Sequence, residues 1–363
     1  RLHPDRLAEQ VERLAHHALR GEVWDKAVTY LWQAGTKAAE RSANREAVAC
    51  FEQALMALEH LPESRETKEQ AIDLRLDLRQ SLFALTEFGR VLDHLREAEA
   101  LAMTLGDQRR LGFVSILMTI HFWITGDTER AVESGQRAFA IAEALGDFAR
   151  LVRTNWLVGL VYNTMGNYPR AIDHLRRAVA TLEGNLTYYE RFAMPRLPSV
   201  FSRVLFARGL AERGEFGEAI ARGEEGVRIA ESVDDPSSLI AAFSGVGFVY
   251  LRKGDVQKAV FLLQRSLELG KAAKIPLWFP NNASDLGTAY ALSGRVTEAL
   301  PLLEQAVEGR RAAQALRVAN LSEGYLLAGR MEDASQAAQR ALALSRVHKE
   351  RGNEAWSLRL LGE

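Results

Sequence analysis

A turn that recurs about every 40 residues constrains this chain more than any other feature of its sequence. A glycine followed by a polar residue ends an apolar helical run at six points, which are Gly126, Gly166, Gly214, Gly254, Gly294 and Gly329. An alanine stands five residues after each of these glycines, and a second series of turns falls roughly midway between them, at Gly106 and Gly146. Two turns per period indicate two helices per repeat. The sequence therefore predicts an array of helical hairpins.

The residues at and around these turns suit the same structure. Glycine just past a helix end adopts the left-handed conformation without a Cβ penalty, and a following Asp or Asn can cap the next helix. Small and aromatic residues also recur at fixed spacing within the repeats, at Gly159, Tyr162 and Ala171, at Gly247, Tyr250 and Ala259, and at Gly287, Tyr290 and Ala299. Small residues let two helices approach closely while the tyrosine fills the groove beside them. We predict an all-α fold, a right-handed α-solenoid of antiparallel hairpins.

The chain divides into four predicted segments. Residues 1–62 are expected to form an entry module of three less regular helices, at about 4–20, 22–41 and 43–60. Residues 63–183 and 200–363 carry the hairpin repeats, with a truncated helix at the end. The segment 184–199 lies between them and contains Pro195 and Pro198, which forbid one continuous helix. We expect this insertion to fold back over the array or to form a short extra turn on its outer face.

Composition excludes several classes of partner. The chain has 46 Lys and Arg against 47 Asp and Glu, so it has no global field to attract phosphate backbones or anionic lipid. No apolar run approaches the length of a membrane span. We therefore expect neither a nucleic-acid nor a membrane partner.

A single cysteine, Cys50, excludes an internal disulfide and favours a cytoplasmic setting. The chain begins with Arg1, and we expect it to be a fragment of a longer protein.

No pattern of catalytic or metal-binding residues emerges from the sequence. It contains neither G-x-x-x-x-G-K-[ST] nor H-E-x-x-H, and its eight histidines lack the spacing of metal ligands. Cys50 lies in a helical core pattern, where a buried inert thiol is expected. We expect no cofactor, no metal and no catalysis in this chain. An enzyme fragment and an RNA-binding helical repeat remain as alternatives, the second disfavoured because such modules usually need a basic groove.

The candidate binding residues lie on the first helix of each hairpin, which is expected to line a concave groove. They are Trp123, Arg153, Trp156, Asn163, Phe201, Arg208, Phe248, Arg252, Asn281 and Thr288. Amides can pair with the backbone of an extended peptide, aromatic rings can anchor it, and arginine can bind a carboxylate. Asn163 and Asn281 are the candidate backbone clamps, while packing between repeats is the alternative role for Trp156 and Phe248. The sequence therefore predicts a protein or extended peptide as partner, which includes another domain of the same chain, with a small molecule as the alternative.

The repeat resembles the tetratricopeptide (TPR) family over about nine-tenths of the chain. The family pattern W-x2-L-G-x2-Y, followed by A, F and A, is nearly present from Trp156 to Ala178. Trp156 stands one place late, and the period of 40 exceeds the usual one of about 34. The extra residues would lengthen both helices by part of a turn.

Longer segments carry a more specific resemblance. Among them are RFAMPRLPSVFSR and KIPLWFPNNASDLGTAYALSGRVTEALPLLEQAV. They resemble the C-terminal region of large bacterial signalling proteins in which a class III adenylate/guanylate cyclase domain precedes an AAA-type or STAND-type ATPase module and a TPR array. The resemblance implies a non-catalytic, cytoplasmic regulatory arm that senses a partner. The TPR arm of a large ATPase-type transcription regulator is the alternative.

Overall fold

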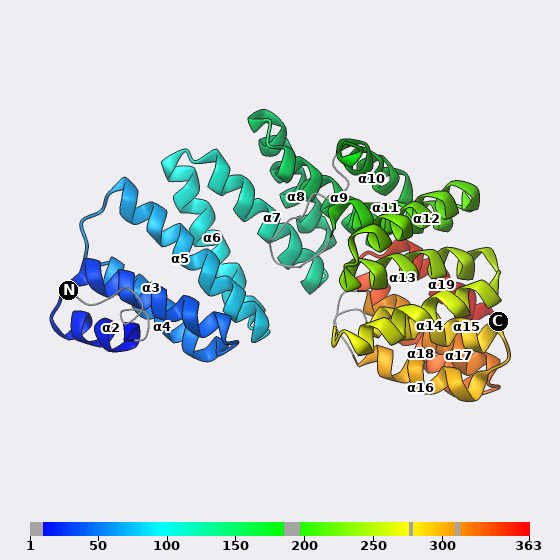
Figure 1. The fold of residues 1–363 in the computed structure, drawn as a ribbon. Helices are drawn as coiled ribbons and strands as arrows, with labels where there is room; N and C mark the ends of the chain where they lie inside the picture. Colours follow the sequence, from blue (N-terminus) through cyan, green and yellow to red (C-terminus); the bar gives the residue numbers. More distant parts are fainter. Residues whose placement is uncertain (1–9, 185–196, 276–278, 309–312) are drawn as a thin grey trace. The chain divides into compact units, whose positions relative to one another are not determined.

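The structure, a computed structural model, describes residues 10–184, 197–275, 279–308 and 313–363. Every regular element in these ranges is an α-helix, and the fold is the α-solenoid that the repeat pattern predicts (Figure 1). The chain forms two compact units, unit 1 up to His121 and unit 2 from Phe122 onward. The division between them falls within helix α7 (Gln108–Thr125). None of the described helices combines the length and the apolar character that a membrane span requires.

Unit 1 contains five complete helices before α7. They are α2 (Val11–Arg20), α3 (Trp24–Glu40), α4 (Asn44–Leu58), α5 (Arg65–Ala84) and α6 (Phe88–Leu105). From α3 to α6, each helix packs on the one before it. The side chain of Ser64 accepts a hydrogen bond from the backbone N–H of Thr67 and so caps α5. The helices expected at about 22–41 and 43–60 correspond to α3 and α4, whereas residues 4–9 of the first expected helix lie outside the described ranges.

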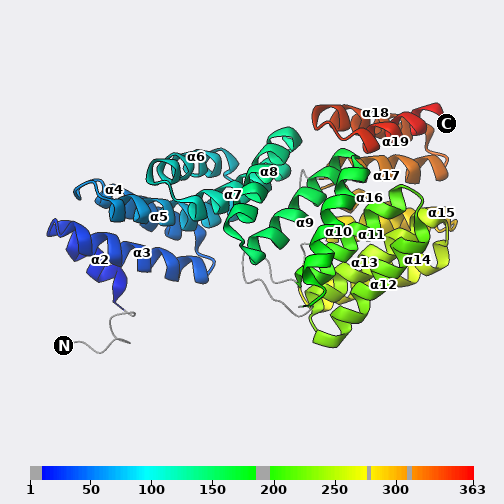
Figure 2. The same cartoon turned by 90° about the horizontal axis from the view of Figure 1, so that it is seen from above.

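Unit 2 continues the array with twelve helices after α7. They are α8 (Thr128–Leu145), α9 (Phe148–Met165), α10 (Tyr168–Leu182), α11 (Pro198–Glu212), α12 (Phe216–Val233), α13 (Pro236–Lys253), α14 (Val256–Ala272), α15 (Phe279–Leu292), α16 (Val296–Val307), α17 (Gln314–Leu327), α18 (Met331–Val347) and α19 (Arg351–Gly362). Figure 2 shows neighbouring helices of this unit side by side, with α18 and α19 stacked beyond α17.

Two layers follow from the packing of unit 2. The odd-numbered helices from α9 to α19 are the first helices of the hairpins, and they contact one another as well as the second helices. The central ones, α11 and α13, are buried on almost every side. We call the surface that the odd-numbered helices share the inner face. Most of the predicted insertion at 184–199 lies outside the described residues, and the boundaries at 62, 183 and 199 remain predictions.

Glycine sets the spacing within the hairpins. A Cβ atom on Gly159 would lie 2.5 Å from Cγ of Leu175, and one on Gly247 would lie 2.7 Å from Cγ of Leu263. Gly287 faces Leu303 in the same way. Each leucine therefore fills the space that a side chain at the glycine would take, and the two helices come into close contact. The alanines Ala171, Ala259 and Ala299 are fully buried beside these contacts.

The two ends of unit 2 meet. The turn between α18 and α19 lies against the turns that follow α7 and α9, so that the hydroxyl of Thr128 donates to the carbonyl oxygen of His348 over 3.0 Å. Lys349 forms an ion pair with Glu129 at 2.5 Å. A Cβ atom on Gly166 would lie 2.5 Å from the backbone nitrogen of Gly352. We call this set of interactions the closure contact. It brings α19, red in Figure 1, into contact with α9, which is green in the same figure.

Candidate functional site

The ten predicted groove residues lie on α7 and on the first helices α9, α11, α13 and α15. Sequence reasoning placed all ten on an exposed groove, with packing between repeats as the alternative for Trp156 and Phe248. The structure buries four of them, which are Arg153, Phe201, Phe248 and Thr288. Asn281 is exposed and the other five are partly buried. The difference arises because neighbouring first helices pack directly against one another, so that much of the inner face is covered by the same unit. A role of these residues in binding a partner stays a prediction.

Aromatic residues of the predicted set contact their neighbours. The rings of Trp156 and Phe201 meet edge to face with their centres 5.2 Å apart. The indole Nε1 of Trp123 donates a hydrogen bond to the hydroxyl of Thr164 over 3.0 Å. These contacts join successive first helices, which is the packing role that the sequence left open for Trp156.

Two arginines and an aromatic ring form the centre of the inner face. The guanidinium carbon of Arg208 lies 3.7 Å from the ring centre of Phe248, and that of Arg252 lies 4.9 Å from the same ring. Arg252 also stands 4.8 Å from the ring of Trp356, on α19. A cation over an aromatic face gains about 0.5–2 kcal/mol, depending on how far it is removed from water. We call Arg208, Phe248, Arg252 and Trp356, with the two carboxylates described next, the arginine cluster.

Two carboxylates complete the arginine cluster. Arg252 donates from Nε to Glu212 over 3.0 Å, and Arg208 contacts Asp285 at 3.3 Å. Glu212 and both arginines keep part of their side-chain surface in solvent, whereas Asp285 is almost completely buried. Burial raises the pKa of Asp285, although the positive charges of Arg208 and Arg252 oppose that rise. Burial therefore makes the charged form of Asp285 less favourable than it is in water, while Arg252 and Glu212 remain within reach of solvent.

A second group of polar residues lies beside the arginine cluster. Arg317 donates to the side-chain oxygen of Asn281 over 3.0 Å. Burial lowers the pKa of Arg317 to about 10, while the charges of Glu350 and Asp285 favour its protonated form. Glu350 is buried as well, and burial raises its pKa although it accepts a hydrogen bond from Asn353. The inner face thus contains several charged groups that the fold has withdrawn from water.

Both predicted backbone clamps form hydrogen bonds within the chain. Asn163 donates from Nδ2 to the carbonyl oxygen of Leu205 over 3.0 Å, and so links α9 to α11. Asn281 accepts from Arg317, as described above. Sequence reasoning missed Asp285, Arg317, Glu350 and Trp356. A charged residue inside an otherwise small and apolar first helix, such as Asp285 in NNASDLGTAY, is the signal that would have found the first of them.

The repeat tyrosines carry a recurring contact on the opposite side of the first helices. The hydroxyl of each meets a Gln or Glu from the preceding second helix, and the pairs are Tyr162 with Gln136, Tyr250 with Glu224, Tyr290 with Gln264, and Tyr325 with Glu304. A cation stands over each ring, from Arg170, Lys258, Arg295 and Arg330 respectively.

Within the described ranges, no three His, Cys, Asp or Glu side chains are grouped so as to hold a metal ion.

Comparison with known proteins supports the fold. A family model of the tetratricopeptide repeat matches residues 283–313. No curated protein sequence matches the chain. A Rap protein solved in complex with competence and sporulation factor is similar with a TM-score of 0.57 and 14% identity, over 93% of this chain and 97% of that one. The apo form of RapI gives a TM-score of 0.66 and 13% identity, over 79% of this chain and 99% of that one.

A third similar structure belongs to a larger protein. It is a signal transduction ATPase with numerous domains (STAND) that has a tetratricopeptide repeat sensor, from Pyrococcus horikoshii. The TM-score is 0.51 at 13% identity, over 80% of this chain and 43% of that one. Identities this low show likeness of fold alone. Together with the local family match, these structures show that the chain has the fold of tetratricopeptide-like helical-repeat proteins, a fold that is typically non-catalytic.

Proposed function

We propose that this chain is a protein- or peptide-binding sensor arm of a larger cytoplasmic signalling protein, and that the inner face of unit 2 holds the partner. The observation that carries the proposal is the arginine cluster, in which Arg208 and Arg252 stack on Phe248 and keep part of their surface in solvent. The similarity to a Rap protein solved with competence and sporulation factor, and to a STAND protein with a repeat sensor, supports it.

The chemistry of the arginine cluster favours an extended peptide with a carboxylate. A guanidinium group that lies over an aromatic ring still has N–H donors at its edge, in the plane of the group, with which it can bind a carboxylate. Arg252 donates to Glu212, whose side chain is a quarter exposed. A carboxylate of the partner can replace Glu212 as the acceptor of these donors. Asn163 and Asn281 remain proposed backbone clamps. To bind the peptide backbone in this way, Asn163 gives up its hydrogen bond to Leu205, and Asn281 gives up the one that it accepts from Arg317.

Selection from a random heptapeptide library tests the proposal. The chain is immobilised, displayed peptides are selected on it, and the enriched ones are measured by isothermal titration calorimetry. We expect acidic residues to be enriched and Arg252→Met, which keeps most of the side-chain stem, to weaken binding about tenfold or more. Arg213→Met is the matched control, because Arg213 pairs with Glu215 on the surface of the same unit. Failure to enrich any peptide, or equal affinities for the two variants, would contradict the proposal.

The parent protein is a further part of the proposal. The resemblance seen in the sequence suggests that a class III cyclase domain and an ATPase module stand upstream, and the STAND protein with a repeat sensor supports an ATPase as the parent. The arm of an ATPase-type transcription regulator and a module for small molecules are the alternatives. Sequencing the complete reading frame separates the two parents. A thermal-shift screen of small molecules, repeated with Arg252→Met, tests the third possibility.

A further inference from the structure

Two hairpins of unit 2 carry a hollow at the same place, between successive second helices and beside the repeat tyrosine. Between α8 and α10 the residues that line it with Tyr162 are mostly polar and include Arg170, Asp173, His174 and Arg177. Between α12 and α14 the hollow has a volume of about 560 Å³. Here the equivalent positions carry Lys258, Phe261, Leu262 and Arg265. The second hollow is therefore apolar where the first is polar.

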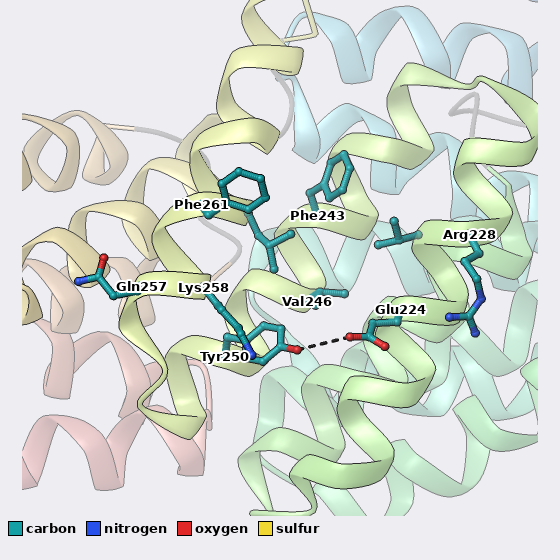
Figure 3. Close-up of a pocket in the computed structure, with 10 residues that line it drawn as sticks. Glu224, Arg228, Phe243, Val246, Tyr250, Gln257, Lys258 and Phe261 are labelled. Carbon is teal, nitrogen blue, oxygen red and sulfur yellow. Dashed lines mark hydrogen bonds between the residues drawn. The ribbon is translucent and has the colours of Figure 1, made fainter.

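Phe261 is the feature that the repeat does not explain. Its side chain lies at the edge of the hollow and is 63% exposed. The equivalent positions of two other hairpins carry Asp173 and Pro301, so the fold requires no aromatic residue here. Figure 3 shows Phe261 from α14 and Phe243 from α13 on the same side of the hollow, with Val246 and Tyr250 below them. Phe243, Val246 and Tyr250 are buried, so Phe261 is the exposed part of this lining, and an exposed aromatic ring beside an apolar hollow is typical of an interaction site.

Positive charge surrounds this apolar surface. Arg228 and Lys258 lie on opposite sides of the hollow (Figure 3), and Arg265 stands 4.5 Å from the ring centre of Phe243. Within the described part of the chain, Arg228 and Arg265 form no ion pair, while Lys258 lies 3.4 Å from Asp255. The one acidic residue of the lining, Glu224, accepts a hydrogen bond from the hydroxyl of Tyr250. The rim of the hollow is therefore complementary to negative charge.

We propose that the hollow between α12 and α14 binds a short acidic segment of a partner protein, which inserts an apolar side chain beside Phe261. The apolar side chain packs against Phe261 and removes this exposed ring from water, above the buried Phe243 and Val246. Carboxylates on either side of it pair with Arg228 and Arg265, which have no ion-pair partner to give up. The hollow lies on the side of the second helices, so this binding is independent of the inner face and of the function proposed for it.

Fluorescence anisotropy with two labelled hexapeptides tests the inference. The probes are EELFEE and KKLFKK, which share the apolar pair and differ in the sign of their charges, and they are titrated with the full chain. We expect EELFEE to bind at least tenfold more tightly than KKLFKK at low salt, with a difference that shrinks as salt is added.

Three variants locate the binding. Phe261→Gln keeps a good helix former at an exposed position and is expected to weaken EELFEE about tenfold, whereas Arg228→Gln is expected to weaken it about threefold. Met331→Gln is the control, because Met331 is also an apolar residue of unit 2 and is 62% exposed. It should leave the affinity unchanged. Circular dichroism of each variant confirms that the helices are intact.

Several outcomes would overturn the inference. Equal affinity for the two peptides would show that the positive charges do not select the partner. An unchanged affinity in Phe261→Gln would show that the peptide does not bind at this hollow. Absence of binding up to roughly millimolar concentration excludes the peptide class altogether. Self-association that Phe261→Gln abolishes, seen by analytical ultracentrifugation, identifies a second copy of the chain as the occupant instead.

Discussion

Replacing Gly166 by alanine tests the closure contact directly. Gly166 follows α9 with a φ of +75°, and Gly254 follows α13 with a φ of +86°. An alanine at either position must adopt the left-handed conformation, which costs roughly 1–2 kcal/mol. A Cβ atom at Gly254 meets nothing within 4 Å. At Gly166 it meets the backbone nitrogen of Gly352 at 2.5 Å and its Cα at 3.0 Å. Gly254→Ala therefore serves as the matched control for strain in the turn.

The structure gives the size of the expected difference. A Cβ normally approaches no closer than about 3.4 Å, so the start of α19 has to move away by roughly 1 Å. Forcing an extra carbon into well-packed structure costs about 1–3 kcal/mol. We expect Gly166→Ala to lower the free energy of unfolding by that amount more than Gly254→Ala does. For a unit of this size, each kcal/mol corresponds to about 2–4 °C in Tm.

Chemical denaturation and hydrogen exchange measure the effect. Urea unfolding gives the two free energies, and exchange followed by mass spectrometry reports where the structure has loosened. In Gly166→Ala we expect faster exchange at the start of α8 and around the turn between α18 and α19. The control should exchange faster only around its own turn. If the two variants lose the same stability and the turn between α18 and α19 stays protected, the closure contact does not hold the ends of unit 2 together.

Three other predictions follow from the packing and the charges. Burial raises the pKa of Asp285, so the free energy of unfolding should fall as pH rises from about 4 through that raised pKa. Urea unfolding at a series of pH values measures this dependence, and Asp285→Asn should flatten it. An unchanged slope in the variant would exclude Asp285 as its source. Gly247→Ala should cost about 1–3 kcal/mol in the same assay despite its better helix propensity, because its Cβ would meet Leu263; a gain in stability would refute the close packing. Tyr290→Phe should cost about 0.5–1.5 kcal/mol by removing the hydrogen bond from Gln264, and a neutral result would mean that solvent replaces it.

The repeat could be predicted from the sequence because its determinants are local. Gly146 ends α8 with a φ of +60°, and the side chain of Asp147 accepts a hydrogen bond from the backbone N–H of Arg150 at the start of α9. Both effects act within a few residues and recur at several turns, as at Gly126 with Asp127 and Gly254 with Asp255. Spacing within a hairpin also follows from neighbours on the two helices, as with Gly159 and Leu175. Patterns of this range are visible in one sequence.

The inner face could not be predicted to the same extent. The exposure of its side chains depends on the distance between successive first helices. The residue pattern within one hairpin does not determine that distance. Phe248, for example, is buried under Arg208 of α11, in a core cluster that also contains residues of α9. The closure contact was missed because it joins residues more than 180 positions apart, and because two of its hydrogen bonds have the backbone carbonyls of Gly126 and His348 as acceptors, which any sequence could supply.

The closure contact has a consequence for how unit 2 comes apart. In an open solenoid the terminal hairpin touches one neighbour, so it frays first and at little cost. Here α18 and α19 are held by α17 on one side and by the beginning of the unit on the other. Detaching this last hairpin therefore breaks two interfaces together. We expect α18 and α19 to fray less readily than the terminal hairpin of an open solenoid.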